Sequence, residues 1–321
     1  MFERVLADGL LAAGRPVIVL YSGGRDSTCL LDLAVRTAGA DAVGALHVNY
    51  GLRDGADADE LHCAQLCERL GVALEVRHPT GAATGNVQAW ARDQRYDAAA
   101  TLARARAAEV AAGHTSTDQV ETILYRLASS PSRRALLGMR DRDGLLIRPL
   151  LGFTRAQTAA YCTERELPWR EDESNESDAF ARNRIRRALV PALETVHPAA
   201  QRNVLALAEI LRDEATVLDE LVQDALGGQN QIELARLREL PSALRRLVVQ
   251  RLADEAAGEP AAGVGRRADE VAGLSEHGSA ALDLPHGVRA TAIDGVLRFG
   301  RTPRRSEAAA QTRRPQGRPI D

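Results

Sequence analysis

The chain has 321 residues, of which 45% are hydrophobic, and this is enough for about two compact domains with their own cores. Its formal net charge of −3 excludes a protein that binds nucleic acid through a strongly basic overall balance, so any such contact must come from local clusters. No run approaches the roughly 18 consecutive apolar residues of a membrane span, and the four cysteines (Cys29, Cys63, Cys67 and Cys162) fit no disulfide framework, so the composition favours a cytoplasmic protein with no membrane contact.

The first half of the chain alternates short β-rich runs with amphipathic helical patterns. The predicted strands are 17–21, 43–49, 74–77 and 109–114, with 145–148 as a fifth candidate, and the predicted helices are 27–37, 57–70, 86–107 and 117–128. This alternation predicts an α/β fold in which a parallel sheet is covered by helices on both faces. Because such sheets bind ligands beyond the carboxyl ends of their strands, functional residues are expected directly after strands.

From about Pro198 onward the pattern becomes mainly helical. Helices are predicted over 203–226, 234–256 and 266–274, followed by a hairpin in which 281–284 pairs with 295–299. Residues 301–321 carry six arginines and three prolines with almost no large apolar side chains, which predicts disorder. We therefore predict a first domain over 1–197, a smaller and mainly helical domain with a closing hairpin over 198–300, and a disordered tail over 301–321.

The strongest local signal is a glycine-rich loop between the first strand and the first long helix. Its residues are Ser22, Gly23, Gly24, Arg25, Asp26 and Ser27. The glycines let the backbone approach a bulky anion, and the helix that follows directs free N–H groups and its positive dipole end at that anion. A carboxylate beside phosphates is repulsive unless a cation lies between them, so Asp26 predicts a bridging Mg²⁺. The simpler alternative, an ordinary glycine-rich turn, would suffice for Ser-Gly-Gly alone.

Two other strands end in histidine, His47 and His114. Taken alone, His47 fits a satisfied polar residue. His114 precedes a helix that carries Asp118 and Glu121 one turn apart, and these carboxylates suit binding an ammonium group or moving a proton. On the opposite face the helix has an apolar stripe, predicted to be buried, of Val120, Ile123, Leu124 and Leu127. The simpler alternative is a solvated helix start with Asp118 near the favourable dipole end.

A basic segment, Arg182-Asn183-Arg-Ile-Arg186, follows the acidic stretch 171–175. On a helix Arg182 and Arg186 share one face. A solvated amphipathic surface is the simpler interpretation of such a helix. The functional interpretation is contact with a phosphate or with charge that develops in a transition state.

In order and spacing, these segments resemble the tRNA(Ile)-lysidine synthetases, a family of the N-type ATP pyrophosphatase (PP-loop) superfamily. The likeness covers residues 15–195 well. The matching segments are 22–27, 47–53, 91–96, 113–122, 148–151, 171–175 and 182–186. Three features depart from the family pattern: Tyr50 stands in place of a histidine, Thr117 replaces the first aspartate of a pair, and 129–132 replaces a glycine-rich loop.

The resemblance implies ligation of free L-lysine to C2 of the wobble cytidine in a tRNA(Ile) with a CAU anticodon. The cytidine C2 oxygen attacks the α-phosphate of ATP and pyrophosphate leaves, after which the lysine ε-amine attacks C2 and AMP departs. The protein could also form a homodimer, and the sequence leaves this open.

The resemblance also implies a role for each matching site residue. ATP would be bound by Ser22, Gly23, Gly24, Arg25, Asp26, Ser27 and His47, with Mg²⁺ on Asp26. Asp26, His114, Asp118 and Arg186 would be catalytic. Lysine would be held by Asp118 and Glu121, and RNA by Arg182, Asn183 and Arg186.

Two alternatives to lysine ligation stay open. The first is sulfur transfer to tRNA by the same ATP chemistry, for which Cys63 and Cys67 would be candidates, although their spacing within a helical pattern favours core packing. The second is a catalytically decayed paralogue that binds RNA, which the departures at Tyr50 and Thr117 would permit.

Overall fold

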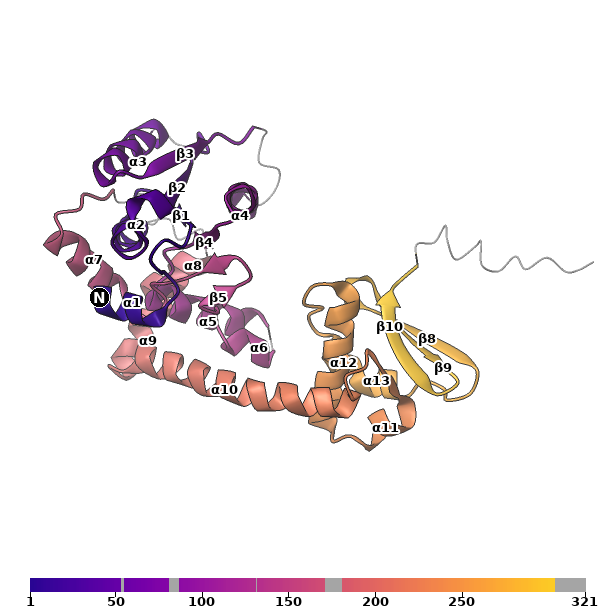
Figure 1. Cartoon of the computed structure of the whole chain (residues 1–321). Helices are drawn as coiled ribbons and strands as arrows, with labels where there is room; N and C mark the ends of the chain where they lie inside the picture. The colour runs from indigo at the N-terminus through magenta and orange to yellow at the C-terminus, as the bar shows by residue number, and fades with distance from the viewer. Residues whose placement is uncertain (53–54, 81–86, 131, 171–180, 304–321) are drawn as a thin grey trace, which may run out of the picture. The chain divides into compact units, whose positions relative to one another are not determined.

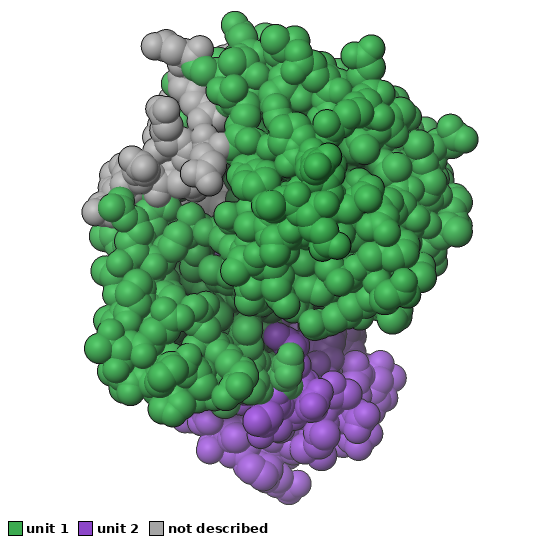
Figure 2. All heavy atoms as spheres, turned by 90° about the vertical axis from the view of Figure 1, so that its left-hand side faces the viewer, with its two compact units in different colours: residues 1–209 green, residues 210–321 purple. Residues whose placement is uncertain are grey.

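The computed structural model describes residues 1–52, 55–80, 87–130, 132–170 and 181–303 (Figure 1). The chain divides into two compact units, residues 1–209 and residues 210–321 (Figure 2). Within the described ranges, the helices are too short or too polar for any of them to pass through a membrane. Arg53, the segment 171–175 and most of the predicted tail lie outside the described residues.

Unit 1 is built on a six-stranded sheet with the order β3-β2-β1-β4-β6-β5. The strands are β1 (Val17–Leu20), β2 (Val43–Val48), β3 (Ala73–Arg77), β4 (Glu109–Ala111), β5 (Arg142–Asp143) and β6 (Leu146–Ile147). All pairs are parallel except that β5 runs antiparallel to β6. The central strand β1 pairs with β2 through Val17 and Val43 and with β4 through Val17 and Glu109.

Alternate residues of β1 enter two different cores, because side chains of a strand point to opposite faces of the sheet. Val17 and Val19 belong to the larger core, which includes residues of α1 (Phe2–Asp8), α2 (Arg25–Ala38), α3 (Ala56–Leu70) and α7 (Arg155–Glu164). Ile18 and Leu20 pack into the core formed with α4 (Val87–Ala105). Helices therefore cover both faces of the sheet, which confirms the predicted fold class (Figure 1).

The remaining helices of unit 1 follow β4 and β6. They are α5 (Ser116–Ser129), α6 (Arg133–Leu136), α8 (Ala181–Arg184), the π-helical turn η3 (Ile185–Leu189) and α9 (Val190–Val196). Helix α10 (Ala200–Leu226) continues past the boundary between the two units.

Unit 2 combines short helices with a four-stranded antiparallel sheet of order β7-β10-β9-β8. Its elements are β7 (Gln231–Glu233), α11 (Leu234–Glu239), α12 (Ser242–Ala257), η4 (Val264–Arg267), α13 (Ala268–Ala272), β8 (Ser279–Leu284), β9 (Val288–Ile293) and β10 (Val296–Arg301). Val288, Ala290 and Ala292 alternate into a core that also contains Leu252 of α12 and Leu297 of β10.

Two predictions for this half of the chain were wrong. Residues 281–284 do not pair with 295–299, because β9 lies between β8 and β10 and pairs with both. Asp294 and Gly295, with φ of 47° and 81°, form the tight turn that joins β9 to β10, as Asp-Gly commonly does in hairpins. The predicted helix 234–256 is interrupted at Leu240 and Pro241, since proline lacks the N–H that a helix interior needs.

Candidate active site

The glycine-rich loop leaves β1 and closes on itself before α2 begins. Ser27 Oγ donates a hydrogen bond to the Gly24 carbonyl over 2.8 Å and lies 3.1 Å from Ser22 Oγ. Gly23 has a φ of +78°, and a side chain there would also come within 3.1 Å of Cys63 Sγ, so this position needs glycine. The loop thus places the unpaired N–H groups at the start of α2 around a space suited to an anion.

Asp26, on the first turn of α2, is held by side chains of α7. Thr158 Oγ1 donates a hydrogen bond to Asp26 Oδ1, and Arg155 Nε lies 3.5 Å from Oδ2. On its own helix, Arg25 Nε lies 3.3 Å from Oδ1. Asp26 is therefore an ionic partner of α7 as well as a member of the loop.

The described residues contain no group of three or more His, Cys, Asp or Glu side chains that could hold a metal ion. Asp26 alone would fit Mg²⁺ only in the mode in which the ion keeps several waters and is bound chiefly by substrate phosphates.

His47 lies beside the loop and is buried. Its Nδ1 donates to the Tyr21 carbonyl over 3.0 Å, directly before Ser22, and lies 3.4 Å from Cys63 Sγ. Tyr50, which departs from the family pattern, donates from its hydroxyl to the Ala91 carbonyl over 2.7 Å and so ties the end of β2 to α4.

Gly113 brings the second half of the site against the loop. A Cβ at this position would stand 3.1 Å from the backbone carbonyl carbon and oxygen of Asp26 and 3.2 Å from the Ser27 nitrogen. A side chain here would require the loop backbone to shift by a few tenths of an ångström, so glycine favours the close approach of the end of β4. Sequence reasoning placed both motifs at one edge of the sheet, and Gly113 accounts for their contact.

Asp118 and Glu121 lie on the first turns of α5, and both are buried, with 5% and 0% exposure. Thr115 caps the helix: its backbone N–H and hydroxyl donate to Asp118 Oδ2 over 2.7 and 2.8 Å. The solvated helix start considered from the sequence is therefore excluded. One detail of the predicted stripe was wrong, because Leu127, near the end of α5, is 56% exposed.

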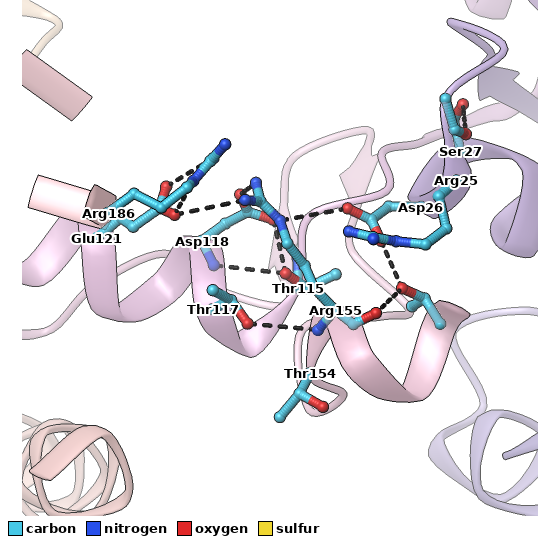
Figure 3. Close-up of polar contacts among 12 residues, drawn as sticks. Arg25, Asp26, Ser27, Thr115, Thr117, Asp118, Glu121, Thr154, Arg155 and Arg186 are labelled. Atoms are coloured by element: carbon cyan, nitrogen blue, oxygen red, sulfur yellow. Dashed lines mark hydrogen bonds and ion pairs between the residues drawn. The ribbon is translucent and has the colours of Figure 1, made fainter. Parts of the chain in front are cut away.

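Three guanidinium groups surround these two carboxylates, and Figure 3 labels two of them, Arg155 and Arg186. Arg155 Nη2 lies 2.7 Å from Asp118 Oδ1, and Arg182 Nη2 lies 2.9 Å from the same oxygen. Glu121 receives Arg182 Nε at 2.8 Å, Arg186 Nε at 2.6 Å and, more distantly, Arg155 Nη1 at 3.6 Å. Burial acts to raise the pKa of Asp118, but Arg155, Arg182 and the Thr115 hydrogen bonds hold that pKa below its ordinary value.

Arg182 and Arg186 come from α8 and η3, and both side chains reach Glu121. Asn183, the third predicted RNA contact, is buried.

Arg155 was not singled out from the sequence, although it contacts all three site carboxylates. It is the first residue of α7, whose capping box joins Thr154 and Gln157. Its backbone N–H donates to Thr117 Oγ1 over 3.3 Å, so the residue that departs from the family pattern helps to position α7. The capping-box spacing could have indicated the start of α7, but nothing local indicates which carboxylates Arg155 contacts.

His114 contributes a neutral imidazole to the same edge of the sheet. Burial lowers its pKa to about 4, with Arg148, Arg182 and Arg92 adding to this effect against the opposing charge of Asp118. Its Nδ1 is buried without a hydrogen-bond partner among the described residues. Because the ring is uncharged near neutral pH, this nitrogen is able to accept a hydrogen bond or a proton, although the lowered pKa makes it a weaker base than an ordinary histidine.

The cysteines have a different character. Cys63 and Cys67 are buried in the core between α3 and the sheet. Burial raises the pKa of the Cys63 thiol, and it raises that of Cys67 to about 12, so both stay protonated near neutral pH. Protonated core thiols are poor nucleophiles, and the structure gives no support to sulfur transfer through this pair.

The parallel sheet and the glycine-rich loop after its central strand define a PP-loop protein. The family model described as a PP-loop domain matches residues 2–193. A solved U34-tRNA thiolase from Methanococcus maripaludis has the same fold, with a TM-score of 0.53 and 18% identity over 66% of this chain and 78% of that one.

Similarity to curated relatives identifies one family among the PP-loop proteins. A tRNA(Ile)-lysidine synthase from Symbiobacterium thermophilum is 38% identical over 94% of this chain and 68% of its own length. One from Thermus thermophilus is 36% identical over 79% of this chain and 51% of its own length. The chain belongs to the tRNA(Ile)-lysidine synthase family. It spans about half the length of several of these curated relatives.

Proposed function

We propose that this chain ligates free L-lysine to C2 of the wobble cytidine of a tRNA(Ile) with a CAU anticodon, consuming ATP and releasing AMP and pyrophosphate. The observation that carries the proposal is that Arg155 bridges Asp26 of a PP-loop to the buried carboxylate pair, at the sheet edge where Gly113 packs against the loop. We assign the chemistry to the predicted first domain, residues 1–197, and place the reaction in the cytoplasm, where its substrates occur. The smaller domain over 198–300 and a homodimer stay predictions.

The first step is activation of the base. The loop amides and the hydroxyls of Ser22 and Ser27 would hold the pyrophosphate part of ATP and stabilise the charge that develops as it leaves. When bound, Mg²⁺ held by Asp26 and the phosphates supplies neutralising charge. The cytidine C2 oxygen bonds to the α-phosphorus as the bond to pyrophosphate breaks, leaving an adenylated base.

The second step is attack by lysine. Asp118 and Glu121 attract the ε-ammonium, and the lowered pKa of Asp118 keeps it charged for this purpose. The ε-ammonium first loses one proton to water, because only the free amine carries the lone pair that attacks C2. As the C2–N bond forms, the nitrogen loses a second proton, which can pass to the neutral His114. AMP then leaves with the oxygen that came from the cytidine. Arg182 and Arg186 are proposed to contact the RNA or the phosphate charge nearby, and Asn183, which is buried here, would have to become exposed to join them.

The test is incorporation of radiolabelled lysine into RNA. A tRNA(Ile) transcript with the CAU anticodon should retain label in the presence of ATP. A transcript with uridine in place of the wobble cytidine should retain none, because the C4 amino group of cytidine donates electron density to the attacking C2 oxygen, whereas uridine has a C4 carbonyl and a proton on N3. Equal labelling of both transcripts, or none of either, would reject the proposed function.

A further inference from the structure

Among the described residues, three guanidinium groups already contact the two carboxylates where lysine is expected to bind. Asp118 and Glu121 supply two negative charges, while Arg155, Arg182 and Arg186 supply three positive charges within 3.6 Å of them. An ε-ammonium would be a fourth cation against the same two carboxylates. Because like charges at such distances repel strongly in a partly buried site, a guanidinium must withdraw before the ammonium can bind well.

Arg155 has an alternative ionic partner. Its Nη2 lies 2.7 Å from Asp118, while its Nε lies 3.5 Å from Asp26 of the loop. The side chain starts at the first residue of α7, where the backbone is fixed by its hydrogen bond to Thr117. Figure 3 shows the guanidinium between the carboxylate of Asp26 on one side and that of Asp118 on the other. Rotation of this side chain would therefore exchange one anionic partner for another.

Nucleotide binding would change the balance between these partners. ATP brings several negative charges to the loop next to Asp26, and a guanidinium is well suited to phosphate oxygens because it can donate two parallel hydrogen bonds. Arg155 would be drawn toward the loop, and the place beside Asp118 and Glu121 would open for an ammonium.

We propose that Arg155 is a positioning residue that fills the lysine ammonium site in the nucleotide-free protein and vacates it when ATP binds. This inference rests on the proposed function and adds cooperativity to it: bound ATP strengthens the binding of lysine. Thermodynamic linkage requires the converse as well, so lysine strengthens ATP binding by the same factor. Lysine therefore binds mainly to protein that already holds ATP.

The experiment measures lysine affinity with and without nucleotide. Equilibrium dialysis with radiolabelled lysine is run in the presence of the tRNA, either without nucleotide or with an ATP analogue that carries a methylene group between the α- and β-phosphates and so blocks cleavage. The wild-type chain should bind lysine roughly 5- to 150-fold more tightly with the analogue, the usual range for two coupled sites. The Arg155→Met variant should bind lysine without the analogue, and its affinity ratio should fall to about 1.

Two further variants separate this role from a purely structural one. Arg155→Lys keeps a cation that can occupy the ammonium site, so it should retain much of the nucleotide dependence. Arg165→Met is the matched control, because Arg165 adjoins the other end of α7 and its Nε lies 3.5 Å from Asp32, away from the site. This control should keep the wild-type ratio.

The result that overturns the inference is a wild-type affinity for lysine that does not depend on the analogue, or an Arg155→Met variant that keeps the full dependence. If Arg155→Met does not fold, the wild-type ratio and the Arg155→Lys ratio still decide the matter. Failure of the proposed function looks different, since wild-type protein would then place no labelled lysine on the tRNA at all.

Discussion

The half-buried side chain of His114 makes the stability of the fold depend on pH. Its pKa is lowered from 6.5 to about 4 in the folded chain, so between these values the unfolded chain binds a proton that the folded chain does not. The contribution of His114 to the free energy of unfolding is therefore fully present above pH 6.5 and is lost as the pH falls toward 4. Linkage gives a loss of about 2 kcal/mol between pH 7 and pH 5 from His114 alone.

Denaturant unfolding at pH 7 and pH 5 measures this loss, with His114→Gln as the comparison. The variant should lose less stability over this interval than the wild type, by about the same 2 kcal/mol. The same pH dependence in both proteins would show that His114 keeps an ordinary pKa.

Asp26 is expected to matter for chemistry more than for folding. Asp26→Asn keeps the size of the side chain and can still accept from Thr158, but it loses the charge that pairs with Arg155 and would hold Mg²⁺. We expect the fold to persist and pyrophosphate release to fall by roughly 100- to 1000-fold, as for the loss of one transition-state electrostatic contact. Asp41→Asn, on the short helix after α2, is the control. Unchanged turnover at an unchanged melting temperature would remove Asp26 from the mechanism.

Asp118 should divide the two halves of the reaction. Asp118→Asn removes the charge that attracts an ammonium but leaves the loop intact, so lysine incorporation should fall steeply while ATP affinity persists. Thr117→Asp should have a much smaller effect, because Asp118 already supplies the buried carboxylate. Both variants are assayed separately for lysine incorporation and for ATP affinity. Loss of ATP binding with normal lysine affinity in Asp118→Asn would reverse the assignment.

At the scale of elements, the site depends on the close approach of β4 to the loop before α2. Gly113→Ala would place a Cβ 3.1 Å from the Asp26 carbonyl, and backbone atoms there cannot yield as a flexible side chain would. We expect a loss of about 1–3 kcal/mol in stability, as for other overpacked sites, together with weaker ATP binding. Gly300→Ala in β10, where no atom lies within 4 Å of the added Cβ, is the control. If Gly113→Ala has the same free energy of unfolding and ATP affinity as this control, the contact between β4 and the loop is not tightly packed.

Elements with a regular pattern were predictable from the sequence. The strand–loop–helix unit around Asp26 and the helix carrying Asp118 and Glu121 follow directly from strand ends and helical periodicity. Strand β9 was missed, although the alternation of Val288, Ala290 and Ala292 before Asp-Gly is a hairpin signal.

Other features come only from tertiary contacts. Arg155 is 37 residues from Asp118 and 129 from Asp26, and no local pattern pairs it with either of them. The burial of Asp118 and Glu121 was likewise not predictable, because it depends on arginines that arrive from α7, α8 and η3. Sequence motifs thus predicted which carboxylates matter, while the structure shows which cations face them.

At the scale of the whole molecule, similarity to the family extends beyond the PP-loop domain. The domain model ends at residue 193, whereas the likeness to the Symbiobacterium relative covers 94% of the chain. The family relationship thus reaches into unit 2, residues 210–321.

The central claim is that ATP cleavage at the loop and lysine attachment at the carboxylate pair are two halves of one reaction. The most direct test is a single reaction in which AMP, pyrophosphate and lysine retained on the CAU-anticodon tRNA are counted together. Joint catalysis predicts equal amounts of all three products. Without lysine it predicts no free AMP and no more than the single pyrophosphate per enzyme that formation of the adenylated base releases. AMP and pyrophosphate formed continuously without lysine on the tRNA would contradict the account.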